Sequence, residues 1–291
     1  MKKNSLCHRF DPTPYILLLP VILFFGAFTF YPFIKTVVLS FALTDKRGNV
    51  AKWVGFSNYI RVFQKPEFWK IVKNTFLFAF INLFFTFTIA MVFALISTRK
   101  TRGSKVYELM YSLPMAIASA PAACIWTFLF RNEGGLLNIV LGTSYAWTQN
   151  LSTALISVSI VTIWMNVGSS FIFFLVGFRN VSQDLIESSL IDGAGPLRRI
   201  WSIILPIASP QIFFVLFLNI TTSFKAFAQI NLMTQGGPNM ATTTLVYEVY
   251  KKAIVQGRFE TGCVYAITLF VIIFIITRIQ FYFENRMVHY Q

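Results

Sequence analysis

The sequence contains little charge and few of the residues that carry acid–base, thiol or metal chemistry. Of its 291 residues only 12% are charged, two are histidine and three are cysteine. Cys7, Cys124 and Cys263 stand far apart, so neither a disulfide framework nor a zinc site is predicted. The chain also has no Gly-Lys dipeptide, which excludes a phosphate-binding P-loop from it.

Titratable residues are missing from the places where an ion-driven carrier needs them. The eleven acidic residues all lie outside the middle of the apolar runs, and His8 and His289 lie near the two chain ends. Carriers driven by protons or ions commonly place such groups inside the helix bundle. An enzyme embedded in the membrane would likewise need clustered acids, histidines or metal ligands there. If this chain transports a solute uphill, a separate subunit must therefore hydrolyse ATP.

Apolar surface is what the chain has in abundance. Hydrophobic residues make up 56% of it, 33 residues are Phe, and the mean hydropathy is +0.63. A helix needs about 20 apolar residues to cross about 30 Å of hydrocarbon. The sequence therefore predicts an all-α polytopic membrane protein, a single domain over 1–291 with six transmembrane helices. The predicted spans cover about 15–43, 71–97, 106–130, 153–178, 203–229 and 261–283.

The connections between the spans differ in composition. Residues 44–73 mix aromatic and basic side chains, which predicts an interfacial helix within an aromatic belt. Residues 131–152 are a loop with room for one short helix, and 179–202 and 230–260 are polar. The net charge of +14 indicates contact with anionic lipid headgroups rather than with nucleic acid. Lys and Arg are nearly balanced between the two sides, and only the basic cluster at 99–105 favours a cytoplasmic N-terminus.

The polar segment after the fourth span carries the most specific pattern. It consists of Glu187, Ser188, Ser189, Gly193, Ile203, Leu205 and Pro206. This spacing resembles the cytoplasmic loop of ABC importer permeases, in which Glu-Ala-Ala, three residues, Gly, nine residues and Ile-x-Leu-Pro follow one another. Ser188 and Ser189 replace the two alanines, which keeps both side chains small. An amphipathic surface helix is the alternative interpretation, and it leaves five positions in register unexplained.

Three further segments extend the resemblance to nearly the whole chain. They are 15–41, 55–75 and 234–245. With these segments the chain resembles the carbohydrate-uptake type of ABC importer permease in particular, similar to the maltose and glycerol-phosphate permeases. The resemblance implies the type I importer permease fold, and it places 183–206 in the cytoplasm together with both termini. It implies that this loop docks on an ATPase through Glu187, Ser188, Ser189, Asp192, Gly193 and Ala194. It also implies that Gly236, Gly237 and Pro238 belong to an external loop near the substrate entrance.

The resemblance to maltose-type permeases also implies a substrate site, near the bilayer midplane between the fourth and fifth spans. The matching positions are Thr162, Met165, Asn166, Ser169, Asn219, Thr222, Ser223 and Ala226. Hydrogen bonding between helices is the alternative role for these polar side chains. For Lys225, snorkelling to the external interface is favoured over contact with an anionic substrate.

The expected function is that of the membrane-spanning translocation subunit of an ATP-driven, binding-protein-dependent importer of oligosaccharides or related polyols. The resemblance implies a second homologous permease, two ATPase subunits that bind ATP and Mg, and an extracellular binding protein as partners. No cofactor or metal is expected in this chain, and its location is the bacterial cell membrane. The alternative is a non-transport membrane scaffold or an intramembrane enzyme.

Overall fold

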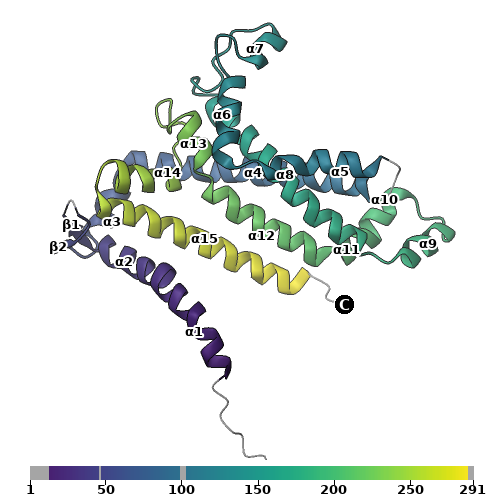
Figure 1. The fold of residues 1–291 in the computed structure, drawn as a ribbon, viewed down its shortest axis with the longest axis horizontal. Helices are drawn as coiled ribbons and strands as arrows, with labels where there is room; N and C mark the ends of the chain where they lie inside the picture. Colours follow the sequence, from purple (N-terminus) through teal and green to yellow (C-terminus); the bar gives the residue numbers. More distant parts are fainter. Residues whose placement is uncertain (1–12, 46, 99–102, 288–291) are drawn as a thin grey trace, which may run out of the picture.

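The computed structural model describes residues 13–45, 47–98 and 103–287, and its long helices run side by side (Figure 1). The α-helices are α1 Thr13–Phe25, α2 Tyr31–Ser40, α3 Ser57–Phe63, α4 Pro66–Ser97, α5 Ser104–Ser112, α6 Ser119–Leu129, α7 Leu136–Leu141, α8 Ala154–Arg179, α9 Gln183–Ile191, α10 Pro196–Arg199, α11 Leu205–Ile207, α12 Ser209–Lys225, α13 Ala228–Met233, α14 Leu245–Tyr250 and α15 Phe259–Met287. The π-helical turns are η1 Gly26–Phe30, η3 Ile200–Ile204 and η4 Lys251–Val255, and the 3₁₀ turn is η2 Leu113–Ala116.

Within the described residues, five helical stretches are long and apolar enough to cross a membrane, and a sixth candidate is bent. The five are Ile16–Ser40, Pro66–Ser97, Ala154–Arg179, Ser209–Met233 and Phe259–Glu284. The third predicted span, 106–130, corresponds to this sixth candidate, in which α5 and η2 are bent by 101° from α6, so the span is broken rather than one straight helix. Pro114 lies in the first turn of η2 and has no N–H to continue the ladder of α5. Figure 1 shows α6 and α7 projecting away from the long helices.

The first connection contains strands that the all-α prediction missed. The helix predicted to reach residue 43 ends at Ser40, and β1 Ala42–Thr44 pairs antiparallel with β2 Val50–Trp53. The Asp45 carboxylate closes the turn by accepting hydrogen bonds from the backbone N–H groups of Asn49 and Arg47, at 2.8 and 2.9 Å. The bond from Asn49 lowers the pKa of this carboxyl group. The predicted interfacial segment is therefore a hairpin followed by α3.

The fifth span is divided, whereas the sequence predicted one helix over 203–229. A π-helical turn and the short α11 precede α12, and Pro206 and Pro210 lie at the starts of α11 and α12. At the other end α12 stops at Lys225, because Ala226 has an extended backbone with ψ of 114°, and α13 begins at Ala228. The predicted polar connection 230–260 likewise contains α14 and η4.

The centre of the bundle is formed by α4, α8 and α12. Small Ala90 and Ala94 of α4 are fully buried against Phe171 and Phe174 of α8, with Val215 of α12 in the same cluster. The small side chains allow the α4 and α8 backbones to approach closely. The outlying element is α1, which diverges from the bundle in Figure 1 and has no buried side chain among residues 16–25.

Candidate functional site

Helix α9, which carries the most specific sequence pattern, is capped at both ends by its own residues. The Ser182 hydroxyl accepts a hydrogen bond from the backbone N–H of Asp184 at 3.3 Å, as an N-cap side chain does. At the other end Gly193 has φ of +73° and donates to the Leu190 carbonyl, while Ala194 donates to the Ser189 carbonyl. This pair of bonds is a Schellman motif, which requires a left-handed residue at the Gly193 position.

The outer face of α9 is exposed and mixes apolar with acidic groups. Glu187, Ser188 and Asp192 are exposed, and Ile191 has 87% of its surface exposed. Ser189, predicted to share the coupling role, is only 6% exposed and its hydroxyl donates to the Ile186 carbonyl at 2.7 Å. Of the two serines in the motif, Ser188 is therefore available to a partner and Ser189 faces the protein.

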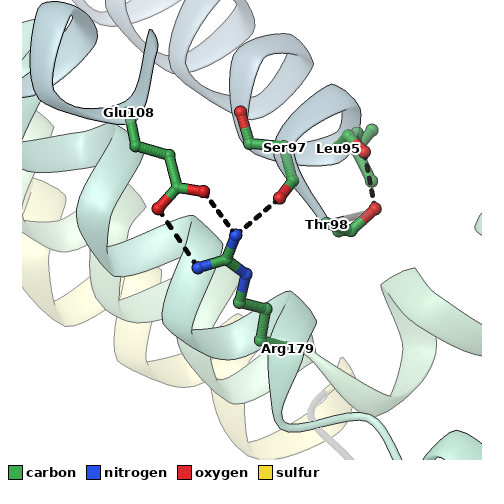
Figure 2. A network of polar contacts seen from close by, with 5 residues as sticks. All are labelled: Leu95, Ser97, Thr98, Glu108 and Arg179. Atoms are coloured by element: carbon green, nitrogen blue, oxygen red, sulfur yellow. Dashed lines mark hydrogen bonds and ion pairs between the residues drawn. The ribbon is translucent and has the colours of Figure 1, made fainter. Parts of the chain in front are cut away.

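An ion pair fixes the bundle immediately before α9. The Arg179 guanidinium donates through Nη2 and Nη1 to the two carboxylate oxygens of Glu108, at 2.6 and 3.3 Å (Figure 2). The same Nη2 donates to the Ser97 carbonyl at 2.8 Å. The contact joins the ends of α8 and α4 to the middle of α5, and both charged side chains are about three-quarters buried. Sequence reasoning missed this pair, although opposite charges close to two predicted helix ends were a usable signal.

The polar residues predicted to bind substrate on α8 and α12 divide into two groups. Asn219 is buried and its side-chain oxygen accepts a hydrogen bond from the Ser170 hydroxyl at 3.0 Å, so it joins α12 to α8. Thr162 is also buried, with its hydroxyl bonded to the Val158 carbonyl of its own helix. The alternative of hydrogen bonding between helices describes the observed contact of Asn219, whereas the Thr162 hydroxyl bonds within its own helix.

The second group is accessible. Met165, Asn166 and Ser169 of α8 are half-buried, and Thr222 and Lys225 of α12 are exposed. Ser223 does not belong to this group, because it is buried like Asn219 and Thr162, whereas Ala226 is half-buried. Lys225 is the last residue of α12 rather than a residue deep in a continuous helix, and its charge there complements the negative end of the helix dipole. Gln229 of α13, which sequence reasoning missed, donates to the sulfur of Met165 in α8 at 3.2 Å.

The loop predicted to be external contains the left-handed backbone that its glycines predict. Gly236 has φ of +80°, and a Cβ there would lie 2.6 Å from the Thr243 hydroxyl. The hydroxyl groups of Thr242 and Thr243 donate to the carbonyls of Gly237 and Gly236, at 2.8 and 2.9 Å. These bonds turn Gly236-Gly237-Pro238 into a fixed structure rather than a loose connection.

The same loop is tied to the start of α4. The Asn74 side chain donates to the Met240 carbonyl at 2.8 Å, and the Lys70 ammonium donates to the Asn239 carbonyl at 2.7 Å. The buried backbone N–H of Leu245 donates to the Thr75 hydroxyl at 2.9 Å. Beside the loop lies a cavity of about 370 Å³ that is lined partly by Arg131, Gln149 and Pro238.

Comparisons with known proteins cover nearly the whole chain. The family model described as "Binding-protein-dependent transport system inner membrane component" matches residues 86–289. The sn-glycerol-3-phosphate transport system permease protein UgpA of Yersinia enterocolitica is 32% identical over 282 residues, which are 96% of each chain. The UgpA protein of Salmonella typhimurium is 31% identical over 286 residues, again 96% of each chain.

Two solved structures share the fold. The chain is similar to a subunit of a bacterial ABC transporter involved in the import of the acidic polysaccharide alginate, with a TM-score of 0.86 and 22% identity over 96% of this chain and 97% of that one. It is also similar to a chain of the MetNI methionine ABC transporter, with a TM-score of 0.59 and 16% identity over 78% of this chain and 100% of that one. The architecture is therefore that of a type I ABC importer permease.

Proposed function

The chain belongs to the family of binding-protein-dependent transport system inner membrane components, and from this premise we propose how its parts divide the work of transport. It is the membrane-spanning translocation subunit of an ATP-driven importer in the bacterial inner membrane, and ATP hydrolysis belongs to a separate subunit. Such a permease works with ATPase subunits and a substrate-binding protein. In our proposal, α9 contacts the ATPase and is displaced by its conformational change, and the substrate binds at the break between α12 and α13.

The proposed complex contains a second homologous permease, two ATPase subunits that bind ATP and Mg, and an extracellular binding protein. The α9 end of the bundle faces the cytoplasm, with both termini on that side, and the Gly236-Gly237-Pro238 loop faces outward. Support for this orientation comes from the motif around Glu187 and Gly193. The exposed acidic and apolar face of α9 supplies the contact with the ATPase.

Coupling follows from how α9 is built. Its caps keep it rigid as a short helix, so a push on Glu187 or Ile191 displaces the whole helix rather than unwinding it. ATP binding closes the two ATPases, draws the coupling helices of the two permeases together and opens the path outward. Hydrolysis returns the helices and opens the path inward, which is alternating access around a fixed midplane site.

The accessible group on α8 and α12 supports the substrate site. The observation that carries the proposal is the break after Lys225, because a discontinuous span exposes backbone groups and helix ends at membrane depth. Asn166, Ser169 and Thr222 are the accessible polar side chains of the predicted set. Amide and hydroxyl groups together with an aromatic ring, such as that of half-buried Phe227, suit an oligosaccharide or related polyol.

A charged substrate is a second candidate, favoured by the exposure of Lys225 at the break. Two relatives carry anions by name, one sn-glycerol-3-phosphate and the other the acidic polysaccharide alginate. An ammonium at membrane depth needs a counter-charge or water. A carboxylate or phosphate on the substrate would supply the counter-charge.

The test uses the complete transporter in proteoliposomes, with uptake and binding-protein-stimulated ATP hydrolysis measured across a panel of oligosaccharides and polyols. Asn166→Leu should weaken apparent substrate affinity by about three- to tenfold, the cost of one lost hydrogen bond, and leave basal ATP hydrolysis intact. Equal loss of both activities would contradict a role in binding.

Thr222→Val and Thr221→Val are a matched pair for this test, since each hydroxyl bonds the carbonyl four residues earlier in α12. Only Thr222→Val should weaken substrate affinity, because Thr221 is not a proposed substrate contact. Lys225→Met should impair an anionic substrate by about tenfold relative to a neutral one of equal size. If the ratio of anionic to neutral substrate transport were the same in wild type and Lys225→Met, Lys225 would be an interfacial side chain rather than a substrate contact.

A further inference from the structure

A cavity of about 770 Å³ lies between α9 and the end of the bundle. Its walls are mainly apolar, with Leu95 of α4 and Phe178 of α8 on the bundle side and Ile186 of α9 on the other. Ile203 of η3 completes this surface. The space is large enough for part of an acyl chain, and its apolar lining favours such an occupant over water.

Two arginines line these walls, and Arg179 is already paired with Glu108. Arg179 lines the cavity and uses Nη1 and Nη2 for Glu108 and Ser97, which leaves its buried Nε without a partner among the described residues. Arg199 of α10 also lines the cavity, and its Nε is buried without a partner within 13–45, 47–98 and 103–287. A buried donor that lacks an acceptor costs free energy, so an anion here would be stabilised.

We propose that this cavity binds an anionic phospholipid, with the headgroup phosphate at Arg199 and an acyl chain along Leu95, Phe178 and Ile203. The inference rests on the proposed function, because that places the α9 end at the cytoplasmic leaflet. That leaflet is rich in anionic lipid, and basic pockets between transmembrane helices recognise such headgroups. The Glu108 carboxylate does not oppose the phosphate, since Arg179 already neutralises it.

The site gives the lipid a role in coupling. The cavity separates α9 from α4 and α8, so motion of α9 toward the bundle is not opposed by direct packing across this space. A lipid there fills the gap and transmits displacement of α9 to the ends of α4 and α8. Anionic lipid should therefore raise the ratio of substrate transported to ATP hydrolysed.

Adjacent arginines provide a matched test. Arg198 is exposed and outside the cavity lining, whereas Arg199 lines it, so Arg198→Gln and Arg199→Gln remove the same charge one residue apart. The complete transporter is placed in phosphatidylcholine nanodiscs containing a small fraction of phosphatidylglycerol, and lipid retained after detergent extraction is quantified by mass spectrometry. Wild type and Arg198→Gln should retain phosphatidylglycerol, and Arg199→Gln should bind it about tenfold more weakly.

Several outcomes would overturn the proposal. Equal retention by the two glutamine variants, or equal retention of phosphatidylcholine and phosphatidylglycerol, would show that Arg199 recognises no headgroup. Displacement of the lipid by inorganic phosphate alone would indicate a site for free anions instead. Ile203→Trp fills the cavity without changing its charge and should also reduce lipid retention. This variant tests the proposal independently if Arg199→Gln misfolds. Lipid retention is measured without transport, so it stays interpretable if the transporter proves not to carry sugars.

Discussion

The loop 234–245 and helix α9 occupy opposite ends of the bundle (Figure 1) and are attached to it differently. The loop is tied to α4, some 170 residues away in sequence, through Asn74 and Thr75. Around α9, by contrast, the hydrogen bonds found for its side chains and caps in the described part of the chain connect only residues within 182–194. Behind α9 lies a cavity, whereas the loop leads into α14, whose Leu245 and Tyr247 are buried.

The difference predicts which end would move during transport. Bonds between elements distant in sequence fix the loop as part of the bundle, so we expect it to stay in place. A helix stabilised by its own caps keeps its shape while its position relative to the bundle can change. The Arg179–Glu108 ion pair marks the boundary between the two regions, because it secures the end of α8 shortly before α9 begins.

The largest expected effect comes from Gly193→Pro. Proline cannot adopt φ of +73° and removes the N–H that donates to Leu190, so the end of α9 loses its cap. Uptake in proteoliposomes should fall to near background, while the permease still copurifies with the rest of the transporter. Gly193→Asn is the control, because asparagine tolerates the left-handed conformation and should retain most uptake. Uptake at the wild-type level by the proline variant would contradict a role of α9 in coupling.

A smaller effect is expected at the boundary ion pair. Arg179→Gln leaves Glu108 about three-quarters buried without its charged partner, which should cost about 1–3 kcal/mol of unfolding free energy. Thermal unfolding of the purified transporter measures this loss. Adding Glu108→Gln should restore part of the stability, since the uncompensated charge is removed. Strictly additive losses in the double variant would mean that the two side chains do not stabilise each other.

The smallest effect is expected at the fixed loop. Thr75→Val leaves the buried Leu245 N–H without an acceptor and should cost about 1 kcal/mol, while Thr75→Ser keeps the acceptor. Hydrogen exchange at 240–248 should accelerate in the valine variant and stay slow in the serine variant. Faster exchange in both variants would indicate that the methyl group of Thr75, rather than its hydroxyl, holds the loop.

Much of the architecture could be predicted, because the length of the apolar runs and the local conformational preferences of the backbone follow directly from the sequence. Runs of about 20 apolar residues identify five spans, and the spacing from Glu187 to Pro206 identified the segment that contains α9. The left-handed Gly193 and Gly236 have the conformations that favour glycine over every other residue. These features depend on neighbours in the chain, so no tertiary contact was needed to infer them.

Only the tertiary structure decided which side chains meet. In a membrane, residues that face lipid and residues that face the bundle are both apolar, so hydrophobic periodicity does not distinguish the two faces of a span. For this reason the sequence did not show that Asn219 bonds Ser170, that Ser189 faces inward, or that Lys225 ends a helix. The bend between α5 and α6 and the strands after Ser40 likewise depend on how distant segments satisfy their backbone groups.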